Sequence, residues 1–461
     1  MRLDSVTLAA VVGGTVAGPV SLFSGVSIDS RSVAEGDLFV ALAGERHDGH
    51  DFLAQALGKA PGALVSRPVP PGSVPAGATL VRVPDTLAAL RALARYVRDT
   101  LRPKVVGVTG SVGKTTTKEL TAALASTRYR VAKTAGNLNN TIGLPLEVAR
   151  MDEDAEVLVA EMGMSTPGEI RLLSELVRPD VGVVTAVAPV HLAGFASLDG
   201  IEAAKAEILS GMGRSSVFVA NADDPRSLSI AGRHTGPVLR YGLSGGTDLD
   251  ATATDLVAEG TGTAFVLRLR GETARVVLPL PGRHNVSNFL AAAAAASALG
   301  IGAEDAARAA PRLLPARHRG QVRALPRGGL LYDDSYNSSP VALAAAFAAF
   351  ETAAGERRKV AVVGEMLELG PRSRQLHEEA GRSIGRRADL LVAVRGDAEA
   401  LARGALLAGA PPASVLFVAD AQAAEAAVAE RLAPGDALFV KGSRGVGLDR
   451  LVDALAPEAA P

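Results

Sequence analysis

The 461-residue sequence contains no cysteine and no tryptophan, and only 3% of its residues are aromatic. The absence of cysteine excludes disulfide scaffolds, thiolate catalysis, and zinc or iron–sulfur sites with cysteine ligands. Lysine and arginine number 48 against 49 aspartates and glutamates, which gives a formal net charge of −1. Because this balance provides no general attraction to polyanions, we expect no nucleic-acid partner.

The sequence also lacks an apolar run long enough to cross a bilayer. The longest run, residues 289–299, is short and mostly alanine. Residues 5–28 carry no charge, but several glycines and Pro19 interrupt them, which is unlike a secretory signal. We expect this segment to be a small β-rich start of a folded domain. The chain as a whole is expected to be cytoplasmic, without stable membrane insertion.

What the sequence does have is a composition suited to burial, with 48% hydrophobic and 21% charged residues. Short apolar segments alternate with helical segments, a pattern typical of a mostly parallel α/β sheet. The expected strands are residues 104–110, 156–163, 180–191, 215–224, 329–335, 358–366, 389–396 and 436–443. Residues 245–281 alternate like antiparallel hairpins, and a helix over residues 288–299 is expected to end at Gly300.

Changes in composition divide this α/β chain into three expected domains. Residues 1–101 form a small α/β domain, and residues 102–313 form a central domain around a mostly parallel sheet. Residues 314–461 form a Rossmann-like α/β domain.

The most informative segment is VVGVTGSVGKTTTK, residues 105–118, between an expected strand and an expected helix. A loop in this context holds phosphate oxygens with backbone N–H groups and the helix N-terminus. Lys114 would contact the terminal phosphates and the Thr115 hydroxyl a magnesium ion. The usual Walker spacing requires glycine where Val108 stands, and Gly110 is present instead. The expected nucleotide contacts are Thr109, Gly110, Ser111, Val112, Gly113, Lys114, Thr115 and Thr116.

Two further polar residues follow expected strands of the same sheet. Glu161 ends one strand and His191 follows the next, and carboxyl ends of parallel strands face one crevice. Because magnesium prefers oxygen ligands, Glu161 is the natural second protein ligand. His191 is either a ligand or a group that orients a phosphate or a water molecule.

The order of motifs along the chain is more specific than any one of them. After TGSVGKTTTKE come GNLNNTIGLPL (136–146), EMGMSTPGEI (161–170), HLAGFASLDGIEAAKAEI (191–208), NADD (221–224), GRHNVSN (282–288), YDDSYNSSP (332–340) and VKGSRG (440–445). This order closely resembles the Mur ligases, ATP-dependent amide ligases that activate a carboxylate as an acyl phosphate. Within that family, the resemblance implies a ligase of peptidoglycan precursor synthesis that joins D-alanyl-D-alanine to a UDP-N-acetylmuramoyl-tripeptide. It implies ATP and two Mg²⁺ ions as cofactors, and we expect a monomer.

The resemblance also implies roles for residues around the nucleotide. Asn285 and Asn288 resemble adenine-contacting asparagines, although Asn285 could also cap the helix. Asp334 resembles the residue that binds the ribose. Arg319 would reach the γ-phosphate, with Arg317 as the competing candidate.

Lys205 resembles a lysine that relatives convert to a carbamate, which helps to hold the second magnesium ion. That chemistry needs a neutral amine, hence a partly buried lysine with a lowered pKa. Glu202, three residues earlier, offers the alternative of an ordinary ion pair.

The remaining candidates concern the two ends of the substrate. The resemblance assigns the UDP-sugar to segments of the first domain, and the asparagine-rich segment 136–146 could bind sugar or peptide. Residues after the last strands could contact the dipeptide carboxylate or the nucleotide. These candidates are Ser30, Arg31, Asp48 and His50, then Asn137, Asn139, Asn140 and Thr141, then Asn337, Ser338, Lys441, Ser443 and Arg444.

Two alternative functions remain open at this point. A sibling ligase that adds another amino acid or acts on folate would share the phosphate loop. A non-enzymatic nucleotide-binding switch or scaffold would bind ATP without acceptor-dependent release of phosphate.

Overall fold

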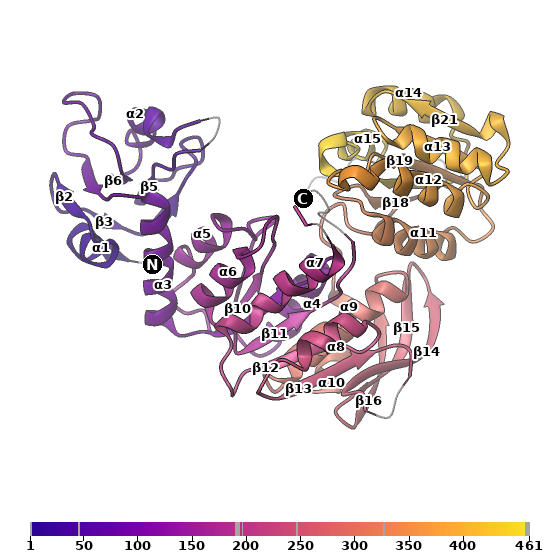
Figure 1. Ribbon diagram of the computed structural model, residues 1–461, viewed down its shortest axis with the longest axis horizontal. Helices are drawn as coiled ribbons and strands as arrows, with labels where there is room; N and C mark the ends of the chain where they lie inside the picture. Colours follow the sequence, from indigo (N-terminus) through magenta and orange to yellow (C-terminus); the bar gives the residue numbers. More distant parts are fainter. Residues whose placement is uncertain are drawn as a thin grey trace. The chain divides into compact units, whose positions relative to one another are not determined.

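A computed structural model describes residues 2–44, 47–189, 194–195, 197–245, 248–325 and 328–456 (Figure 1). The chain packs as two compact units. One comprises Met1–Val108, Arg128–Gly182 and Glu207–Ser216, and the other comprises Thr109–Thr127, Val183–Ala206 and Val217–Pro461. Mixed α/β architecture with mostly parallel strands is confirmed in both.

The first part of the chain folds around a five-stranded sheet in the order β2-β7-β6-β5-β4, and β1 and β3 form a separate ribbon. Neighbouring strands from β4 to β7 run parallel, and β2 is antiparallel at the edge. Its elements are β1 (Leu3–Asp4), α1 (Ser5–Val12), β2 (Thr15–Ala17), β3 (Leu22–Phe23), β4 (Gly25–Ser27), β5 (Asp37–Val40), α2 (Leu53–Ala56), β6 (Gly62–Val65), β7 (Thr79–Arg82) and α3 (Thr86–Leu101).

The middle of the chain builds a nine-stranded sheet in the order β16-β15-β14-β13-β12-β11-β8-β10-β9. The β8–β10 and β12–β13 pairs are parallel, whereas β14, β15 and β16 form the expected antiparallel hairpins. Its elements are β8 (Lys104–Thr109), α4 (Lys114–Ala125), β9 (Val131–Lys133), α5 (Gly143–Ala149), β10 (Val157–Glu161), α6 (Glu169–Val177), β11 (Val181–Val184), α7 (Leu198–Ala206), β12 (Val217–Asn221), α8 (Pro225–Ala231), β13 (Val238–Gly242), β14 (Ala251–Glu259), β15 (Gly262–Leu269), β16 (Glu272–Leu278), α9 (Arg283–Ser297) and α10 (Ala303–Ala309).

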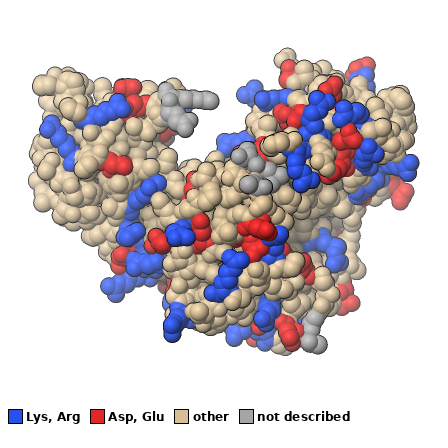
Figure 2. Space-filling model, viewed as in Figure 1, with Lys and Arg blue, Asp and Glu red and all other residues tan. Residues whose placement is uncertain are grey.

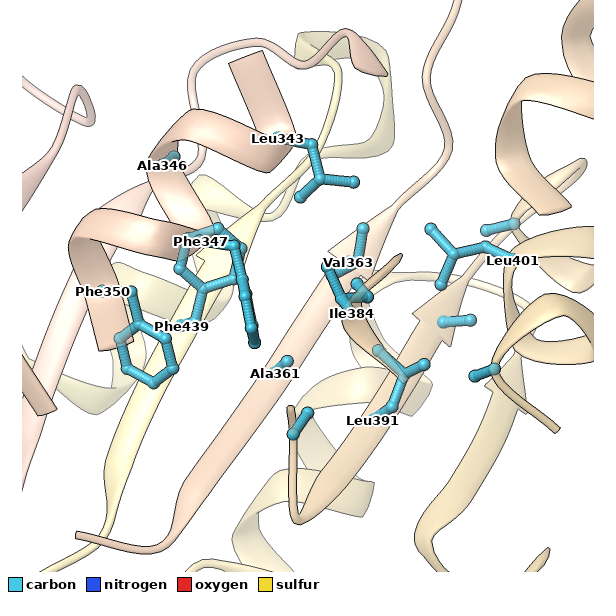
Figure 3. Close-up of a cluster of buried hydrophobic side chains, with 14 of the residues drawn as sticks. Leu343, Ala346, Phe347, Phe350, Ala361, Val363, Ile384, Leu391, Leu401 and Phe439 are labelled. Atoms are coloured by element: carbon cyan, nitrogen blue, oxygen red, sulfur yellow. The ribbon is translucent and has the colours of Figure 1, made fainter. Parts of the chain in front are cut away.

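The last part contains a six-stranded sheet in the order β17-β18-β22-β19-β20-β21, parallel except for the edge strand β17. An apolar cluster fills one face, where Phe347 and Phe350 of one helix pack against Phe439 of the sheet (Figure 3). Its elements are β17 (Gln321–Ala324), β18 (Leu330–Asp334), α11 (Pro340–Ala354), β19 (Lys359–Gly364), α12 (Ser373–Ile384), β20 (Leu390–Val394), α13 (Ala398–Leu407), β21 (Val415–Val418), α14 (Ala421–Arg431), β22 (Ala437–Lys441) and α15 (Asp449–Leu455).

Two local predictions differ from the structure. The N-terminal segment contains the helix α1, because Asp4 caps its first turn and Gly13, at φ +65°, ends it. Helix α9 begins at Arg283, five residues earlier than expected. Its alanine-rich part is buried on all sides, so it carries no amphipathic pattern from which the start could be read.

The surface bears both signs of charge, interspersed over the face shown in Figure 2, as the balanced composition predicts. Among the described residues, no helix is both long enough and apolar enough to cross a membrane.

Candidate functional site

The loop between β8 and α4 has the shape that the sequence predicts for phosphate binding. Gly110 and Gly113 adopt φ angles of +146° and +81°. A Cβ atom at Gly110 would lie 2.0 Å from Thr185 Oγ1, and one at Gly113 would lie 2.4 Å from Asn288 Oδ1. Both positions therefore require glycine.

The segment after β11 holds this loop in place. The Thr185 hydroxyl donates to the Val112 carbonyl at 2.6 Å. The Ser111 N–H donates to Ala186 O at 2.7 Å, and the Ser111 hydroxyl donates to Ala188 O at 2.9 Å. The loop is thus fixed before any ligand arrives.

The loop leaves its polar groups available to an anion. Gly113 precedes α4 and provides no side-chain cap, so the first N–H groups of the helix keep hydrogen-bonding capacity. Lys114 Nζ donates to Gly110 O at 2.7 Å and to Ser111 O at 3.3 Å, which folds the ammonium group over the loop. Thr115 is buried beside it.

Glu161 ends β10 opposite Val108, in the register of the β8–β10 pair. Its carboxylate is almost fully buried, and Oε1 accepts a hydrogen bond from Asn139 Nδ2 at 2.7 Å. Within the described part of the chain, Oε2 has no hydrogen-bond partner. Because a buried carboxylate oxygen is costly to leave unpaired, this atom suits a cation.

A protein cage for a metal is not visible in the described ranges, which contain no group of three or more histidine, aspartate or glutamate residues placed to hold an ion. Magnesium needs only one or two protein ligands when substrate phosphates and water complete its coordination shell. His191 lies outside the described residues.

Lys205 is fully buried on α7, which meets one requirement for carbamate formation. Glu202 has partners other than this lysine. Its Oε2 accepts from Arg226 Nη1 at 2.7 Å, and its Oε1 accepts from the Ser229 hydroxyl and Arg233 Nη2, each at 2.7 Å.

The two predicted adenine contacts lie on the first turns of α9. Asn285 does not cap this helix, because Gly282 holds the cap position and Asn285 Nδ2 donates to Pro281 O at 2.8 Å. Asn288 Oδ1 accepts from the Thr117 hydroxyl of α4 at 3.5 Å. Asn288 therefore lies beside the phosphate loop.

The two aspartates that end β18 have different partners. The Asp334 carboxylate is bound by Lys441 Nζ, which also donates to Asn337 O at 2.9 Å. Burial raises the pKa of Asp334, while the charges of Lys441 and Arg319 oppose that rise. Asp333 is fully buried and accepts from His318 Nδ1 at 2.8 Å.

The two competing arginines are separated clearly. The Arg319 guanidinium lies 4.1 Å from the centre of the Tyr336 ring, and that of Arg444 lies 5.7 Å from the same ring. Arg317 pairs with Asp453 at 3.1 Å. The geometry therefore favours Arg319 as the arginine near Asp334.

Most of the candidate residues that follow β22 and β18 form hydrogen bonds with neighbouring residues of the same domain. Ser443 Oγ accepts from Leu367 N at 2.9 Å, and Asn337 Oδ1 accepts from Ser338 N at 2.9 Å. The sequence indicated no role for the residues whose hydrogen bonds order this edge, which are Asp333, His318, Glu365 and His377. The run Asp333-Asp334 was a usable signal, because neighbouring residues of a strand face opposite sides.

The first-domain candidates have hydrogen-bond partners within the protein. Arg31 pairs with Asp29 on the surface, and this bond lowers the pKa of Asp29 to about 2. His50 Nδ1 donates to Asp48 at 2.6 Å, and His50 Nε2 accepts from Ser66 N at 2.9 Å.

The remaining candidates in this unit have mixed partners. The Ser30 hydroxyl donates to Gln55 Oε1 at 3.0 Å. Asn140 Oδ1 accepts from Gly143 N at 2.7 Å, which is turn chemistry, and Thr141 O accepts from Arg91 at 3.2 Å. Asn137 is exposed.

Three family descriptions match the chain in order. They are "Mur ligase family, catalytic domain" at residues 22–98, "Mur ligase middle domain" at 108–296 and "Mur ligase, glutamate ligase domain" at 318–444.

Curated relatives match over nearly the full length. The chain is 36% identical to the UDP-N-acetylmuramoyl-tripeptide–D-alanyl-D-alanine ligase of Bacillus subtilis, covering 97% of each chain. It is also 36% identical to the ligase of that name from Escherichia coli, covering 98% of each.

Solved structures give the same result. A MurF crystal structure from Acinetobacter baumannii is 29% identical with a TM-score of 0.88, covering 99% of both chains. A MurF ligase from Thermotoga maritima in complex with ADP is 30% identical with a TM-score of 0.80, covering 94% of this chain and 96% of that one. The three-domain α/β fold is thereby confirmed.

Proposed function

Because the chain belongs to the Mur ligase family, we propose that it is an ATP-dependent ligase that joins D-alanyl-D-alanine to UDP-N-acetylmuramoyl-tripeptide. The products are UDP-N-acetylmuramoyl-pentapeptide, ADP and phosphate. The observation that carries the proposal is the loop between β8 and α4, which hydrogen bonds to the segment after β11 hold in place and over which Lys114 folds.

The reaction has two steps. The terminal carboxylate of the tripeptide attacks the γ-phosphorus of ATP, the bond to ADP breaks, and an acyl phosphate forms. The free amine of D-alanyl-D-alanine then attacks the acyl carbon, phosphate leaves, and the amine gives up a proton. Since phosphoryl transfer needs positioning and charge neutralisation more than covalent chemistry, the loop N–H groups and Lys114 do most of this work.

Glu161 Oε2 has no hydrogen-bond partner among the described residues, which supports a magnesium role for this carboxylate. The Thr115 hydroxyl is proposed as a second ligand. Bound Mg²⁺ would neutralise charge on the phosphate oxygens. Asn139 fixes the carboxylate by its hydrogen bond to Oε1, so Oε2 points in a defined direction.

Lys205 is proposed as a carbamate that serves a second magnesium ion, on the basis of its burial. Depletion of carbon dioxide should lower activity, and added bicarbonate should restore it. A Lys205→Arg variant should be weakly active and unresponsive to bicarbonate. Equal activity of wild type with and without carbon dioxide would contradict this role.

The remaining assignments follow the resemblance and the geometry together. Asp334 is proposed to bind the ribose, which would replace Lys441 as the hydrogen-bond partner of its carboxylate. Arg319 is proposed to contact the γ-phosphate. Asn285 and Asn288 are proposed to contact adenine.

The first experiment is phosphate release by the purified protein with ATP, Mg²⁺ and UDP-N-acetylmuramoyl-tripeptide, with and without D-alanyl-D-alanine. We expect release to require both substrates and mass spectrometry to show the pentapeptide. Release with a different amino acid would move the assignment to a sibling ligase. ATP binding without release under any acceptor would favour a switch or scaffold.

A further inference from the structure

Tyr332 carries a buried hydroxyl that the assigned roles leave unused. Its side chain is fully buried on β18, and its ring packs against Phe350 and Phe439 in the apolar cluster. Among the described residues, its hydroxyl has no hydrogen-bond partner. An unsatisfied buried hydroxyl is destabilising, and phenylalanine would fill the same aromatic position without that cost.

The hydroxyl and one of the asparagines proposed for adenine both approach Gly320. A Cβ atom built on Gly320 would lie 3.3 Å from the Tyr332 hydroxyl oxygen and 3.9 Å from Asn285 Nδ2. Both polar groups therefore approach the same point. Gly320 has a φ of +68°, so a side chain there is unfavourable for backbone reasons as well.

A line of contacts connects this point to the phosphate loop. Asn288 Oδ1 approaches Gly113, and Asn288 Nδ2 donates to Asn285 Oδ1 at 3.5 Å. Asn285 lies three residues nearer the start of α9, a displacement of about 4.5 Å along the helix axis. The Gly320 position, which the Tyr332 hydroxyl and Asn285 Nδ2 both approach, is therefore connected to the phosphate loop through Asn285 and Asn288.

The chemistry of the group fits a neutral base better than a phosphate. Burial raises the pKa of Tyr332, so the hydroxyl stays protonated and both donates and accepts. Adenine presents neighbouring donor and acceptor atoms along its edge, which a side-chain amide reads in pairs. Asn285 donates one amide hydrogen to Pro281 O, and its second amide hydrogen can donate to such an acceptor on the base.

We propose that the Tyr332 hydroxyl hydrogen-bonds the polar edge of the adenine base, next to Asn285, and contributes to selection of ATP. This proposal rests on the proposed function only in taking ATP as the nucleotide. The hydroxyl is a binding contact and takes no part in phosphoryl transfer.

The test compares wild type with Tyr332→Phe by direct binding of a non-hydrolysable ATP analogue, measured by calorimetry, and by thermal melting. We expect the variant to bind about 3- to 10-fold more weakly, as for loss of one neutral hydrogen bond. Without nucleotide its melting temperature should equal or exceed that of wild type, because an unsatisfied group has been removed. The rise in melting temperature at a fixed analogue concentration should be smaller in the variant.

Tyr241→Phe is the matched control for stability. Tyr241 is also fully buried, but its hydroxyl donates to Thr185 O at 3.0 Å. Loss of this hydrogen bond in Tyr241→Phe should lower the melting temperature of the nucleotide-free protein, whereas Tyr332→Phe should leave that temperature unchanged or raise it.

The identity of the base contact is tested with base-modified triphosphates, purine riboside triphosphate and 7-deaza-ATP. Wild type should bind one of them about 3- to 10-fold more weakly than ATP, and this difference should be smaller in Tyr332→Phe, in which only the asparagine contacts to the base remain. Unchanged ATP affinity in Tyr332→Phe overturns this inference and leaves the ligase assignment intact. Failure of wild type to bind ATP at all overturns both.

Discussion

The central and C-terminal sheets both carry polar residues at the carboxyl ends of parallel strands, yet they treat charge in opposite ways. In the central part, Lys114 rests on loop carbonyls and Glu161 keeps one oxygen without a partner among the described residues. In the C-terminal part, Asp334 is bound by Lys441 and Asp333 by His318. The edge of the central sheet has charged side chains that can bind a ligand, whereas the carboxylates at the edge of the C-terminal sheet are paired with other side chains of the protein.

The difference follows from what each edge must bind. Triphosphate and magnesium bring strong charges of their own, so a preformed loop needs no internal counter-charge. The C-terminal edge contains carboxylates that would be costly to bury alone, so each has a cationic or hydrogen-bonding partner on the protein. Ligand binding there must exchange one partner for another.

The largest expected effect concerns the central side of this comparison. Lys114→Ala should lower kcat by about a thousandfold or more, because a fixed cation next to the transferred phosphoryl group is lost. The melting temperature should change little. Lys104→Ala, at the exposed start of the same strand, is the control and should keep full activity. A Lys114→Ala enzyme with a tenth of wild-type activity would show that the loop does not act on phosphate as argued.

The second prediction tests the C-terminal side through stability. Lys441→Met or Asp334→Asn should each destabilise the protein by about 3 kcal/mol, because each leaves a buried group without its partner. The double variant should recover much of this loss. Urea unfolding of the four proteins measures the coupling energy. Additive losses would mean that the two residues do not stabilise each other.

The sequence predicted the central edge better because its residues are contiguous. Glycines at 110 and 113 and the lysine that follows are a local pattern, and both glycines have positive φ angles in the structure. Neighbouring strands and helices were also recovered, but β11 ends at Val184, whereas the sequence predicted a strand up to residue 191. The start of α9 was missed because an alanine segment buried on every side has no periodicity.

The C-terminal edge could not be predicted because its pairs depend on strand register. Asp334 meets Lys441, 107 positions away, only because β18 and β22 pair with these residues opposite each other. Likewise, which of two adjacent aspartates faces His318 depends on which face of β18 is covered. Sequence alone shows neither the register nor the covered face.

A third prediction sharpens the central side again. Glu161→Gln should raise the Mg²⁺ concentration needed for half-maximal activity at least tenfold, because an amide is a much weaker ligand than a carboxylate. The fold should persist, since Asn139 can donate to the new amide oxygen. Glu175→Gln, an exposed change on α6, is the control. Magnesium titrations of phosphate release decide the outcome, and identical midpoints would remove Glu161 from the metal site.

The smallest expected effect concerns His284 of α9, whose pKa is influenced by the charge of Lys441 in the C-terminal domain. Burial, and then the nearby positive charge of Lys441, lower its pKa from 6.5 to about 4. Between pH 4 and pH 6.5, His284 binds a proton in the unfolded chain but not in the folded protein. Its contribution to the free energy of unfolding is therefore complete above pH 6.5 and is lost as the pH falls toward 4. At pH 5 this loss should be about 1–2 kcal/mol, after allowance for partial exposure of the ring. Melting temperatures at pH 7.5 and pH 5 should therefore differ more in wild type than in His284→Gln. An equal acid shift in both proteins would show that His284 is not the group whose lowered pKa reduces stability as the pH falls.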